Sequence, residues 1–528
     1  MINSNSEFDT IIVGAGSAGC VLANRLTENP NHRVLLLEAG GKDWHPFIHM
    51  PAGLAKLVGY TWMNWNYETD PEAELDSRRL YWPRGKVLGG SSSINAMCYC
   101  RGHRLDYDSW AEQGNVGWGF DHVLPYFKKA EDQERGASEF HGSGGPLSVS
   151  NLRHTNPLSA VFIQAAQQAG FPHTDDFNGA RQEGFGYYQV TQRNGQRCSA
   201  AVAYLKPALE RSNLSLMTRT RAQQVLLDGD RATGLRVMRR GRQREIHAGR
   251  VILSSGAINS PQLLLLSGIG PGDHLAELGV PVRHELPGVG QNLQDHLDIC
   301  TLMECTEPLT YDKLNEFAAG LEYFFRKSGP GTSNIAEAGG FVASRHAEDE
   351  RPDIQMHFVP GLLDDHGRNK LPGYGMTIHA CPLRPKSRGE IQLATNDAGT
   401  APLIRANYLS HEYDIRIMLE CVRLARKIYR QPAFSDFIGK EIFPGVDHQT
   451  DEQLLSFIRR KAETIYHPSG TCKMGVDPMA VVDTGLNVHG LNGLNVVDTS
   501  VMPELISGNT NAPTIMIAEK FAAMQNQN

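Results

Sequence analysis

Short apolar runs alternate with glycine-rich turns at the start of the chain. Residues 8–13 (FDTIIV) form a continuous apolar run that predicts a buried strand, and a glycine-rich turn follows it. Residues 18–26 predict a helix, and residues 33–38 (RVLLLE) predict the next strand. This order predicts a compact βαβ unit at the N-terminus.

Later segments predict further parts of the same layered unit. Residues 214–252 alternate in short strand-like runs broken by Asp-Gly-Asp and Arg-Gly-Arg, which predicts an antiparallel meander. Residues 251–254 predict a strand that leads into a helix at 261–266. Near the end, residues 494–497 predict a strand, and residues 513–524 predict a helix whose Pro513 suits a first helical turn.

Two inserts separate these segments. The second of them is rich in strand-like runs, such as residues 354–358 and 388–393. We therefore expect the α/β (α+β) fold class, with a Rossmann-like domain interrupted by an interleaved domain of antiparallel sheet and helices. The predicted cofactor domain comprises residues 1–155, 213–299 and 463–528, and the predicted substrate domain comprises residues 156–212 and 300–462.

Composition and charge exclude several classes of protein. The net charge is −7 over 528 residues, so a nucleic-acid-binding protein is not expected. The nine cysteines are scattered without a C-x-x-C pair, which argues against a disulfide framework or a zinc site and fits a reducing compartment. We find no signal-peptide pattern and no apolar run of membrane-spanning length. We expect a cytoplasmic protein, with peripheral contact to the inner face of a membrane left open.

The glycine-rich turn carries the first candidate chemistry. Gly14, Gly16 and Gly19 form G-x-G-x-x-G between the predicted strand and helix, the arrangement that lets a backbone approach a pyrophosphate. Glu38 closes the second strand at the distance expected for an acid that holds ribose hydroxyls. The motif predicts a dinucleotide and does not separate FAD from NAD, so an NAD-linked dehydrogenase stays open here.

Further motifs carry a family resemblance. Residues 85–102 read GKVLGGSSSINAMCYCRG, residues 256–270 read GAINSPQLLLLSGIG, and HPSGTC at 467–472 precedes GNTNAPT at 508–514. In this order, and across nearly the whole chain, they resemble the signatures of the glucose–methanol–choline (GMC) oxidoreductase family. The resemblance implies the GMC fold and FAD as the cofactor.

The resemblance also assigns cofactor contacts. Residues of the first signature should lie along the flavin and its diphosphate, Ala222 should contact the adenine, and residues near 498 and 513 should face the ribityl chain and the pyrimidine edge. The full expected set is Gly14, Gly16, Ser17, Ala18, Gly19, Glu38, Ala39, Gly89, Gly90, Ser91, Asn95, Ala96, Met97, Ala222, Asp498, Thr499, Pro513 and Thr514. Some relatives tether FAD through a histidine where this chain has Ile94, so we expect noncovalent FAD.

Oxidation of an alcohol requires removal of a proton and a hydride. The family match makes His467 the general base, and histidine suits this role because its ordinary pKa is about 6.5. Asn511 is the expected hydrogen-bond donor to the substrate oxygen, at the start of the C-terminal helix. No metal is expected: His45 and His49 have helical spacing, but Pro46 lies between them.

Substrate and electron acceptor follow from the resemblance alone. It favours a medium-chain aliphatic or aromatic primary alcohol as substrate and a quinone or other carrier as acceptor. Choline, polyethylene glycol and an oxygen-using oxidase stay as alternatives. Asp298 lies near where a choline-binding acid would fall, although one acid does not make an aromatic cage. The aromatic stretch at residues 62–67 lines the substrate entrance in one interpretation and packs in the interior in the other.

Overall fold

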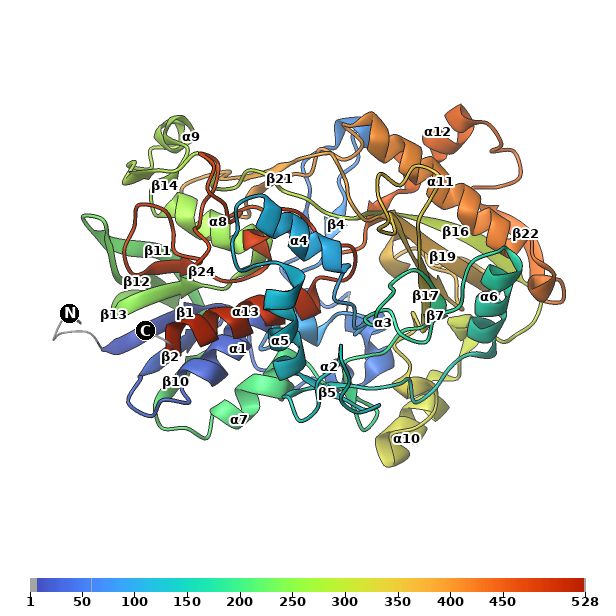
Figure 1. Ribbon diagram of the computed structural model, residues 1–528, viewed down its shortest axis with the longest axis horizontal. Coiled ribbons are helices and arrows are strands. Elements are labelled where there is room, and N and C mark those ends of the chain that lie inside the picture. Colours follow the sequence, from blue (N-terminus) through green and yellow to red (C-terminus); the bar gives the residue numbers. More distant parts are fainter. Residues whose placement is uncertain (1–6, 58, 527–528) are drawn as a thin grey trace.

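Two large β-sheets lie next to each other along the long axis of the molecule, with helices around them (Figure 1). This computed structural model describes residues 7–57 and 59–526. We call the sheet that contains the N-terminal strand the first sheet and the other the second sheet. The first and the last elements of the described chain, β1 (Phe8–Val13) and α13 (Asn511–Asn526), lie side by side at this sheet (Figure 1).

The first sheet is built around the N-terminal βαβ unit. Its parallel part has the order β10 (Leu214–Met217), β2 (Val34–Leu37), β1 (Phe8–Val13), β13 (Arg242–Leu253) and β24 (Leu494–Val496). Val13 pairs with Leu37 on one side and with Leu253 on the other, so three strands end together at one edge. The structure confirms the predicted strands at both chain ends.

The long strand β13 pairs with strands of both the parallel and the antiparallel part of the first sheet. Its C-terminal half pairs with β1, and its N-terminal half pairs in antiparallel register with β12 (Arg231–Arg239), which in turn pairs with β11 (Thr220–Asp228). The predicted antiparallel meander is therefore confirmed for β11 to β13. The first strand of that region, β10, joins the parallel edge instead.

Helices of the first sheet start earlier than predicted at two prolines. α1 (Ser17–Leu26) packs against α13 (Asn511–Asn526), which also contacts α5 (Phe120–Ala130). α8 (Gly256–Leu266) begins five residues before Pro261, and α13 begins two residues before Pro513. Pro513 falls in a first turn, where its missing N–H has no helical partner in any case.

Pro261 is tolerated inside α8 for a specific reason. A proline cannot donate to the carbonyl four residues earlier, which here belongs to Ala257. The Thr471 hydroxyl donates to that carbonyl at 2.6 Å instead. The C-terminal segment that carries the predicted base is thereby attached to a helix of the first sheet.

The second sheet is antiparallel. Its order is β22 (Ile438–Phe443), β16 (Leu297–Cys305), β19 (Gly375–Pro382), β18 (Ile354–Val359), β17 (Ala338–Val342) and β7 (Gly184–Tyr187), and β23 (Glu463–Thr464) pairs with the start of β16. Strands from both expected inserts contribute to it. The exact division into domains stays a prediction.

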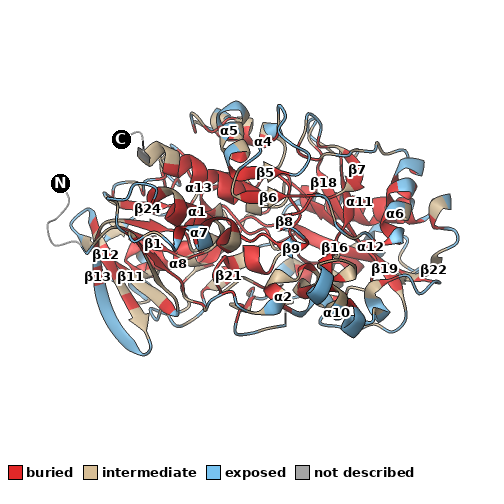
Figure 2. Cartoon of the chain, turned by 90° about the horizontal axis from the view of Figure 1, so that it is seen from below, coloured by how far each residue is buried: buried red, intermediate tan, exposed pale blue. Residues whose placement is uncertain are grey.

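Alternation along the second sheet separates a core face from a second, more polar face. Ile299, Phe358 and Ile378 join a buried apolar cluster with α6 (Pro157–Gln168), α11 (Glu412–Tyr429) and α12 (Asp451–Lys461). Their strand neighbours, such as Asp298 and His379, point the other way because successive side chains alternate in a strand. Buried residues fill the middle of both sheets (Figure 2).

No helix in the part of the chain that the structure describes combines the length and the apolar character needed to span a membrane.

We predict that Gly19→Ala destabilises the protein while Gly320→Ala, the same change in another helix, does not. A Cβ at Gly19 would lie 1.9 Å from the Gly14 carbonyl oxygen, whereas one at Gly320 would meet no atom within 4 Å. We expect the free energy of unfolding to fall by about 1–3 kcal/mol for Gly19→Ala through overpacking. Gly320→Ala should raise it by about 0.5–1 kcal/mol. Equal thermal and urea midpoints for the two variants would contradict this reason for the third motif glycine.

Candidate active site

A cavity of about 880 Å³ is lined from both sheets. It receives most of the residues that the sequence predicts for cofactor and substrate. The lining includes Gly14, Gly16, Ser17, Ala18, Glu38, Ala39, Gly90, Ser91, Asn95, Ala96, Met97, Ala222, His467, Asp498, Thr499, Asn511 and Thr514. Gly19, Gly89 and Pro513 are not among the residues that line the cavity.

The glycine-rich turn leaves room for a phosphate group at the start of α1. No side chain caps this helix, so its first amide groups remain available, and a helix N-terminus favours negative charge. A Cβ at Gly16 would meet no protein atom nearer than 4.0 Å, and one at Gly256 would meet none within 4 Å. Both glycines line the cavity, so this end fits a dinucleotide such as FAD.

Glu38 ties the turn to the end of β2. Its carboxylate accepts hydrogen bonds from the amides of Ala15, at 3.0 Å, and of Gly40, at 2.7 Å. Burial raises the pKa of Glu38 to about 7, although these amides and Lys86 oppose the increase. The side chain lines the cavity, where the remaining lone pairs can accept from ribose hydroxyls.

The segment around Gly90 packs directly on the glycine-rich turn. The amide of Gly89 donates to the Ala15 carbonyl at 2.7 Å, and Gly89 and Gly90 have φ of 88° and 53°. A Cβ at Gly90 would lie 2.8 Å from the Gly16 Cα. Only glycine permits this approach, so two motifs that lie far apart in the sequence form one wall of the cavity.

Arg197 holds Asn95 and was not predicted. Its buried guanidinium donates to the Asn95 side-chain oxygen at 2.7 Å and to the Asn95 carbonyl at 2.6 Å. The Met97 amide also donates to that side-chain oxygen. With its oxygen engaged, the Asn95 amide nitrogen remains to donate at the cavity wall.

Asp498 supports the start of α8. It accepts from the Gly256 amide at 2.8 Å and from the Ser260 hydroxyl at 2.6 Å through one oxygen, and from Ser500 through the other. These contacts join β24 to α8 beneath the cavity. The predicted contact of Asp498 with a ribityl chain stays a prediction.

A chain of hydrogen bonds fixes the protonation of His467. His296 Nε2 lies 3.0 Å from the Leu383 carbonyl oxygen, which can only accept, so this nitrogen carries a hydrogen. Burial lowers the pKa of His296 to about 4, which leaves its Nδ1 as an acceptor at neutral pH. His467 Nδ1 lies 2.9 Å from that atom and must donate. The lone pair of His467 is therefore on Nε2.

The contacts of Asn509 also show that Nε2 of His467 carries the lone pair. Its side-chain oxygen accepts from Gln355 at 3.0 Å, which turns its amide nitrogen toward His467 Nε2 at 3.2 Å. An amide nitrogen donates, so Nε2 accepts. His467, Asn509 and His357 all line the cavity at this end.

This geometry places Asn509, and not Asn511, beside the base. Asn511 was expected to donate to the substrate oxygen; it lines the same cavity, and its side-chain oxygen accepts from the Ser17 hydroxyl at 2.7 Å. Because α13 begins at Asn511 and not at Pro513, the segment before the helix places Asn509 opposite His467. Asn511 instead links the start of α13 to the start of α1.

Asp295 positions the backbone of His467. Its carboxylate accepts from the His467 amide at 2.7 Å, from the Thr464 hydroxyl at 2.5 Å and from the Tyr408 hydroxyl. Burial raises the pKa of Asp295 to about 6. Burial also lowers the pKa of His467 well below its usual value, together with His296, His357 and Arg84. His467 is therefore a neutral base at neutral pH.

Backbone strain gathers around this end of the cavity. Tyr466, immediately before His467, has φ of 75°, Met97 has φ of 60°, and Ile335 has φ of 70°. Positive φ is costly for these residue types, most of all for a β-branched side chain. All three line the cavity, and strained residues of this kind concentrate where a precise geometry is held.

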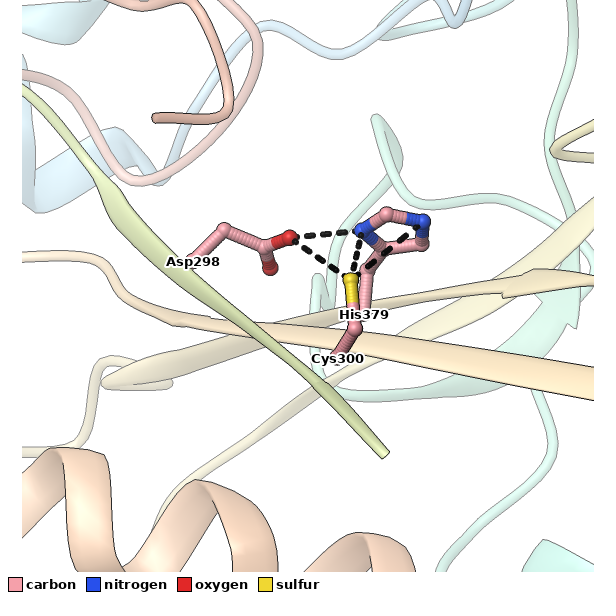
Figure 3. Close-up of side chains that lie close together, drawn as sticks. All are labelled: Asp298, Cys300 and His379. Atoms are coloured by element: carbon pink, nitrogen blue, oxygen red, sulfur yellow. Dashed lines mark hydrogen bonds and ion pairs between the residues drawn. The ribbon is translucent and has the colours of Figure 1, made fainter. Parts of the chain in front are cut away.

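A polar wall lies on the side of the second sheet. Cys300 pairs across strands with His379, and Asp298 pairs with Glu463, so register brings the four side chains together. Asp298 lies 2.5 Å from His379 Nδ1 (Figure 3). The ligand atoms of Asp298, Cys300 and His379 lie within 4.8 Å of one another, as do those of Asp365, His366 and Glu463. The sequence analysis did not predict these metal-capable groups.

The charges of this wall balance each other. Burial alone would lower the pKa of His379, but the Asp298 carboxylate raises it above its usual value. Burial and repulsion from Asp298 raise the pKa of Glu463 to about 8. At neutral pH, Asp298 and His379 thus form an ion pair, and Glu463 is mostly protonated. One oxygen of Asp298 has no hydrogen-bond partner among the described residues.

Family comparisons agree with this geometry. A model described as GMC oxidoreductase matches residues 8–298, and a second with the same description matches residues 385–518. The family implies FAD for the dinucleotide end of the cavity.

Individual relatives are similar over nearly the whole chain. An alcohol dehydrogenase [acceptor] of Pseudomonas putida is 49% identical, over 98% of this chain and 95% of that protein. The mitochondrial choline dehydrogenase of Mus musculus is 48% identical, over 98% and 89%. Among solved structures, pyridoxine 4-oxidase from Mesorbium loti has a TM-score of 0.91 at 32% identity, covering 99% of this chain and 100% of that one.

We predict that Asn509 matters more for the reaction than Asn511. Asn509→Ala removes the donor beside His467 Nε2 and should lower kcat/KM for alcohol by about a hundredfold. Asn511→Ala removes only the contact with Ser17 and should lower it by less than about tenfold. Steady-state rates are compared after normalising to bound flavin, and a larger loss for Asn511→Ala would reinstate the partner predicted from sequence.

We predict that His296 sets the tautomer of the base. His296→Leu should slow reduction of the bound flavin by about ten- to a hundredfold, because the Nδ1 hydrogen of His467 loses its acceptor. His296→Gln should keep most of the rate, since its amide can accept from His467 and donate to Leu383.

The wild-type rate should hold as pH falls below about 6.5 and decline only at lower pH, since the neutral base has a lowered pKa. Stopped-flow measurement of the rate of flavin reduction across pH tests both expectations. Equal losses of rate in His296→Leu and His296→Gln would contradict the role of His296 in setting the tautomer of His467.

Proposed function

The chain belongs to the GMC oxidoreductase family, and from that premise we propose that it oxidises a primary alcohol to the aldehyde with FAD. Electrons would then pass to a quinone-type acceptor. One observation carries the proposal: at the cavity, a buried, neutral His467 accepts through Nε2 from the Asn509 amide, and a substrate hydroxyl that enters between the two can donate to the first and accept from the second.

The two side chains divide the work on the alcohol hydroxyl. A hydroxyl that enters between them donates its proton to His467 Nε2 and accepts from the Asn509 amide. The bound FAD supplies the hydride acceptor for the adjacent carbon. His296 accepts from His467 Nδ1 throughout, so the added proton can reside only on Nε2.

The start of α13 favours negative charge in the same region. Asn511 and Thr514 of its first turn line the cavity, and a helix N-terminus carries about +0.5 charge. The oxygen that loses its proton therefore faces the Asn509 amide near a positive helix end. This supports the proposal that α13 contributes to the reaction as well as to packing.

We propose that FAD is bound noncovalently. Ile94 lines the cavity where some relatives carry a histidine tether, and an apolar side chain cannot form that bond. The cradle of Gly16, Gly90 and Gly256, with the contacts of Glu38 and Asn95, holds the cofactor instead.

The substrate we propose is a medium-chain aliphatic or aromatic primary alcohol. Val359, Leu362, Leu363 and Leu371 line the substrate end and provide apolar contact. The similarity to an alcohol dehydrogenase [acceptor] supports this choice.

Choline is a second candidate because of the polar wall. Asp298 and Glu463 are buried carboxyl groups at the cavity, which Tyr466 and His467 also line. A quaternary ammonium group would favour ionisation of Glu463 and would meet the partner-free oxygen of Asp298. The similarity to choline dehydrogenases supports this candidate.

For the acceptor, we propose a quinone or similar carrier, and we propose peripheral contact with a membrane for its delivery. The similarity to a dehydrogenase that is named for an acceptor supports the first part. Use of oxygen, as in the oxidases among the solved structures, is the alternative.

The proposal predicts anaerobic bleaching of the 450 nm flavin band by alcohols. Acid precipitation of the purified protein should first release the flavin into the supernatant. The panel then compares 1-octanol, benzyl alcohol, choline and 3,3-dimethyl-1-butanol, the neutral isostere of choline. Primary alcohols should bleach the wild type, and His467→Ala should slow bleaching by about a hundredfold or more.

The isostere separates the two substrate candidates. Faster bleaching by 3,3-dimethyl-1-butanol than by choline supports an apolar substrate, and the reverse, lost in Asp298→Asn, supports choline. Reoxidation by a soluble quinone but not by air supports the dehydrogenase. A yellow protein that no alcohol bleaches, or a fully active His467→Ala, would overturn the proposed function.

A further inference from the structure

We propose that helix α10 (Glu316–Arg326) docks this protein onto a bilayer surface with anionic lipids, beside the mouth of the cavity. The proposal rests on the proposed function only where it assigns the acceptor and the substrate to the lipid phase. The docking surface itself, which we define as Phe317, Leu321, Phe324 and Phe325, follows from exposure and charge alone.

These four side chains form a single apolar stripe. They occupy positions i, i+4, i+7 and i+8 of the helix, which fall on one face. Phe317, Phe324 and Phe325 are 76%, 71% and 75% exposed, and Leu321 is 43% exposed. Among the described residues, thirteen large apolar side chains are exposed, and this short helix carries four of them. The concentration on one face distinguishes it from scattered surface residues.

The opposite face holds the helix firmly on the protein. Ala319 and Tyr323 are buried, and the Tyr323 hydroxyl donates to the His49 carbonyl at 2.8 Å. Lys56 of α3 (Leu54–Leu57) forms an ion pair with Glu316 at 2.7 Å. The helix therefore presents its apolar stripe outward from the edge of the molecule (Figure 2).

The docking surface adjoins the cavity mouth. The cavity lining includes Lys56 of α3, Lys313 and Glu316 at the start of α10, and the exposed residues Lys370 and Pro372. A molecule that leaves a membrane beneath α10 would meet this mouth first. A long alcohol and a quinone partition into lipid, so the position suits both.

The charges around the stripe favour anionic lipid. Lys313, Arg326 and Lys370 are exposed and form no ion pair within the described part of the chain. The neighbouring acids are engaged: Glu316 pairs with Lys56, and Glu322 accepts from the Ser328 hydroxyl. An amphipathic helix with phenylalanines on one face and unpaired cations nearby is typical of interfacial binding.

A second copy of the chain is a poorer occupant. Two copies packed through this stripe would bring Lys313, Arg326 and Lys370 of both chains together, and the neighbouring acids outside ion pairs, Asp312 and Glu322, are fewer than these cations. A bilayer with anionic headgroups instead supplies the opposite charge and accepts the phenyl rings. A lipid bilayer, and not a second copy of the chain, is therefore the partner that this docking surface fits.

Vesicle flotation tests the docking surface. The FAD-loaded enzyme is floated with phosphatidylcholine vesicles with and without phosphatidylglycerol. A triple variant, Phe317→Ser, Phe324→Ser and Phe325→Ser, should lower the partition onto anionic vesicles by at least about tenfold. The control triple Val116→Ser, Val446→Ser and Val476→Ser changes three comparably exposed residues elsewhere and should bind as the wild type does.

Activity separates docking from chemistry. With a soluble dye as acceptor, all three proteins should oxidise alcohol at the same rate. With a long-chain quinone in the vesicles, only the phenylalanine variant should slow. Loss of dye-coupled oxidation in all three would count against the proposed function and leave the flotation result standing.

Three outcomes would overturn the inference: a wild type that does not float with anionic vesicles, a phenylalanine variant that floats as well as the control, or a wild-type dimer in size exclusion that the phenylalanine variant alone disrupts. The last result would assign the stripe to a contact between copies.

Discussion

The hydrogen bond between His296 and His467 is the interaction on which the chemistry of this cavity depends. His467 is the donor in this hydrogen bond because the Leu383 carbonyl, which cannot donate, requires the proton of His296 to be on Nε2 and leaves its Nδ1 as an acceptor. A backbone group one residue beyond the end of β19 thus determines which nitrogen of the base accepts. The carbonyl belongs to the fold, so the tautomer does not depend on a titrating partner. Asn509, held by Gln355, meets that same nitrogen from the other side.

Burial disfavours the charged form of the titratable groups around this pair. It lowers the pKa of His296 and His467 and raises the pKa of Asp295 and Glu463. A neutral imidazole is the form that accepts a proton, so burial keeps the base ready at neutral pH. It also weakens the base. The Asn509 amide and the α13 N-terminus offset this weakness, because they stabilise negative charge on the oxygen that loses its proton.

Local pattern predicted the strand, turn and helix at the glycine end of the cavity. A strand, a turn and a helix are contiguous in sequence, so spacing between Gly14 and Glu38 carries their geometry. The base end depends on contacts that spacing does not contain. His296 meets His467 across 171 residues, and Asp298 meets Glu463 through sheet register. The expected site residues did not include Asn509, which lies just before a helix boundary, where a shift of two residues changes which amide meets His467. Proline alone did not mark that boundary, since Pro513 lies inside the first turn.

The polar wall bears on the choice between the two proposed substrates, which overall similarity leaves open. The chain is almost equally similar to alcohol and choline dehydrogenases, and the glycine end suits either reaction. Asp298 and His379 neutralise each other, so the state of the wall depends on Glu463, whose pKa of about 8 keeps it mostly protonated at neutral pH. A neutral alcohol leaves this balance unchanged. A cationic alcohol must gain enough from an ionised Glu463 to release its proton, and that gain has to exceed the desolvation of its own charge. The protonation of Glu463 on the second sheet, far in sequence from the motifs that define the family, is therefore the property of this cavity that differs in its effect on the two proposed substrates.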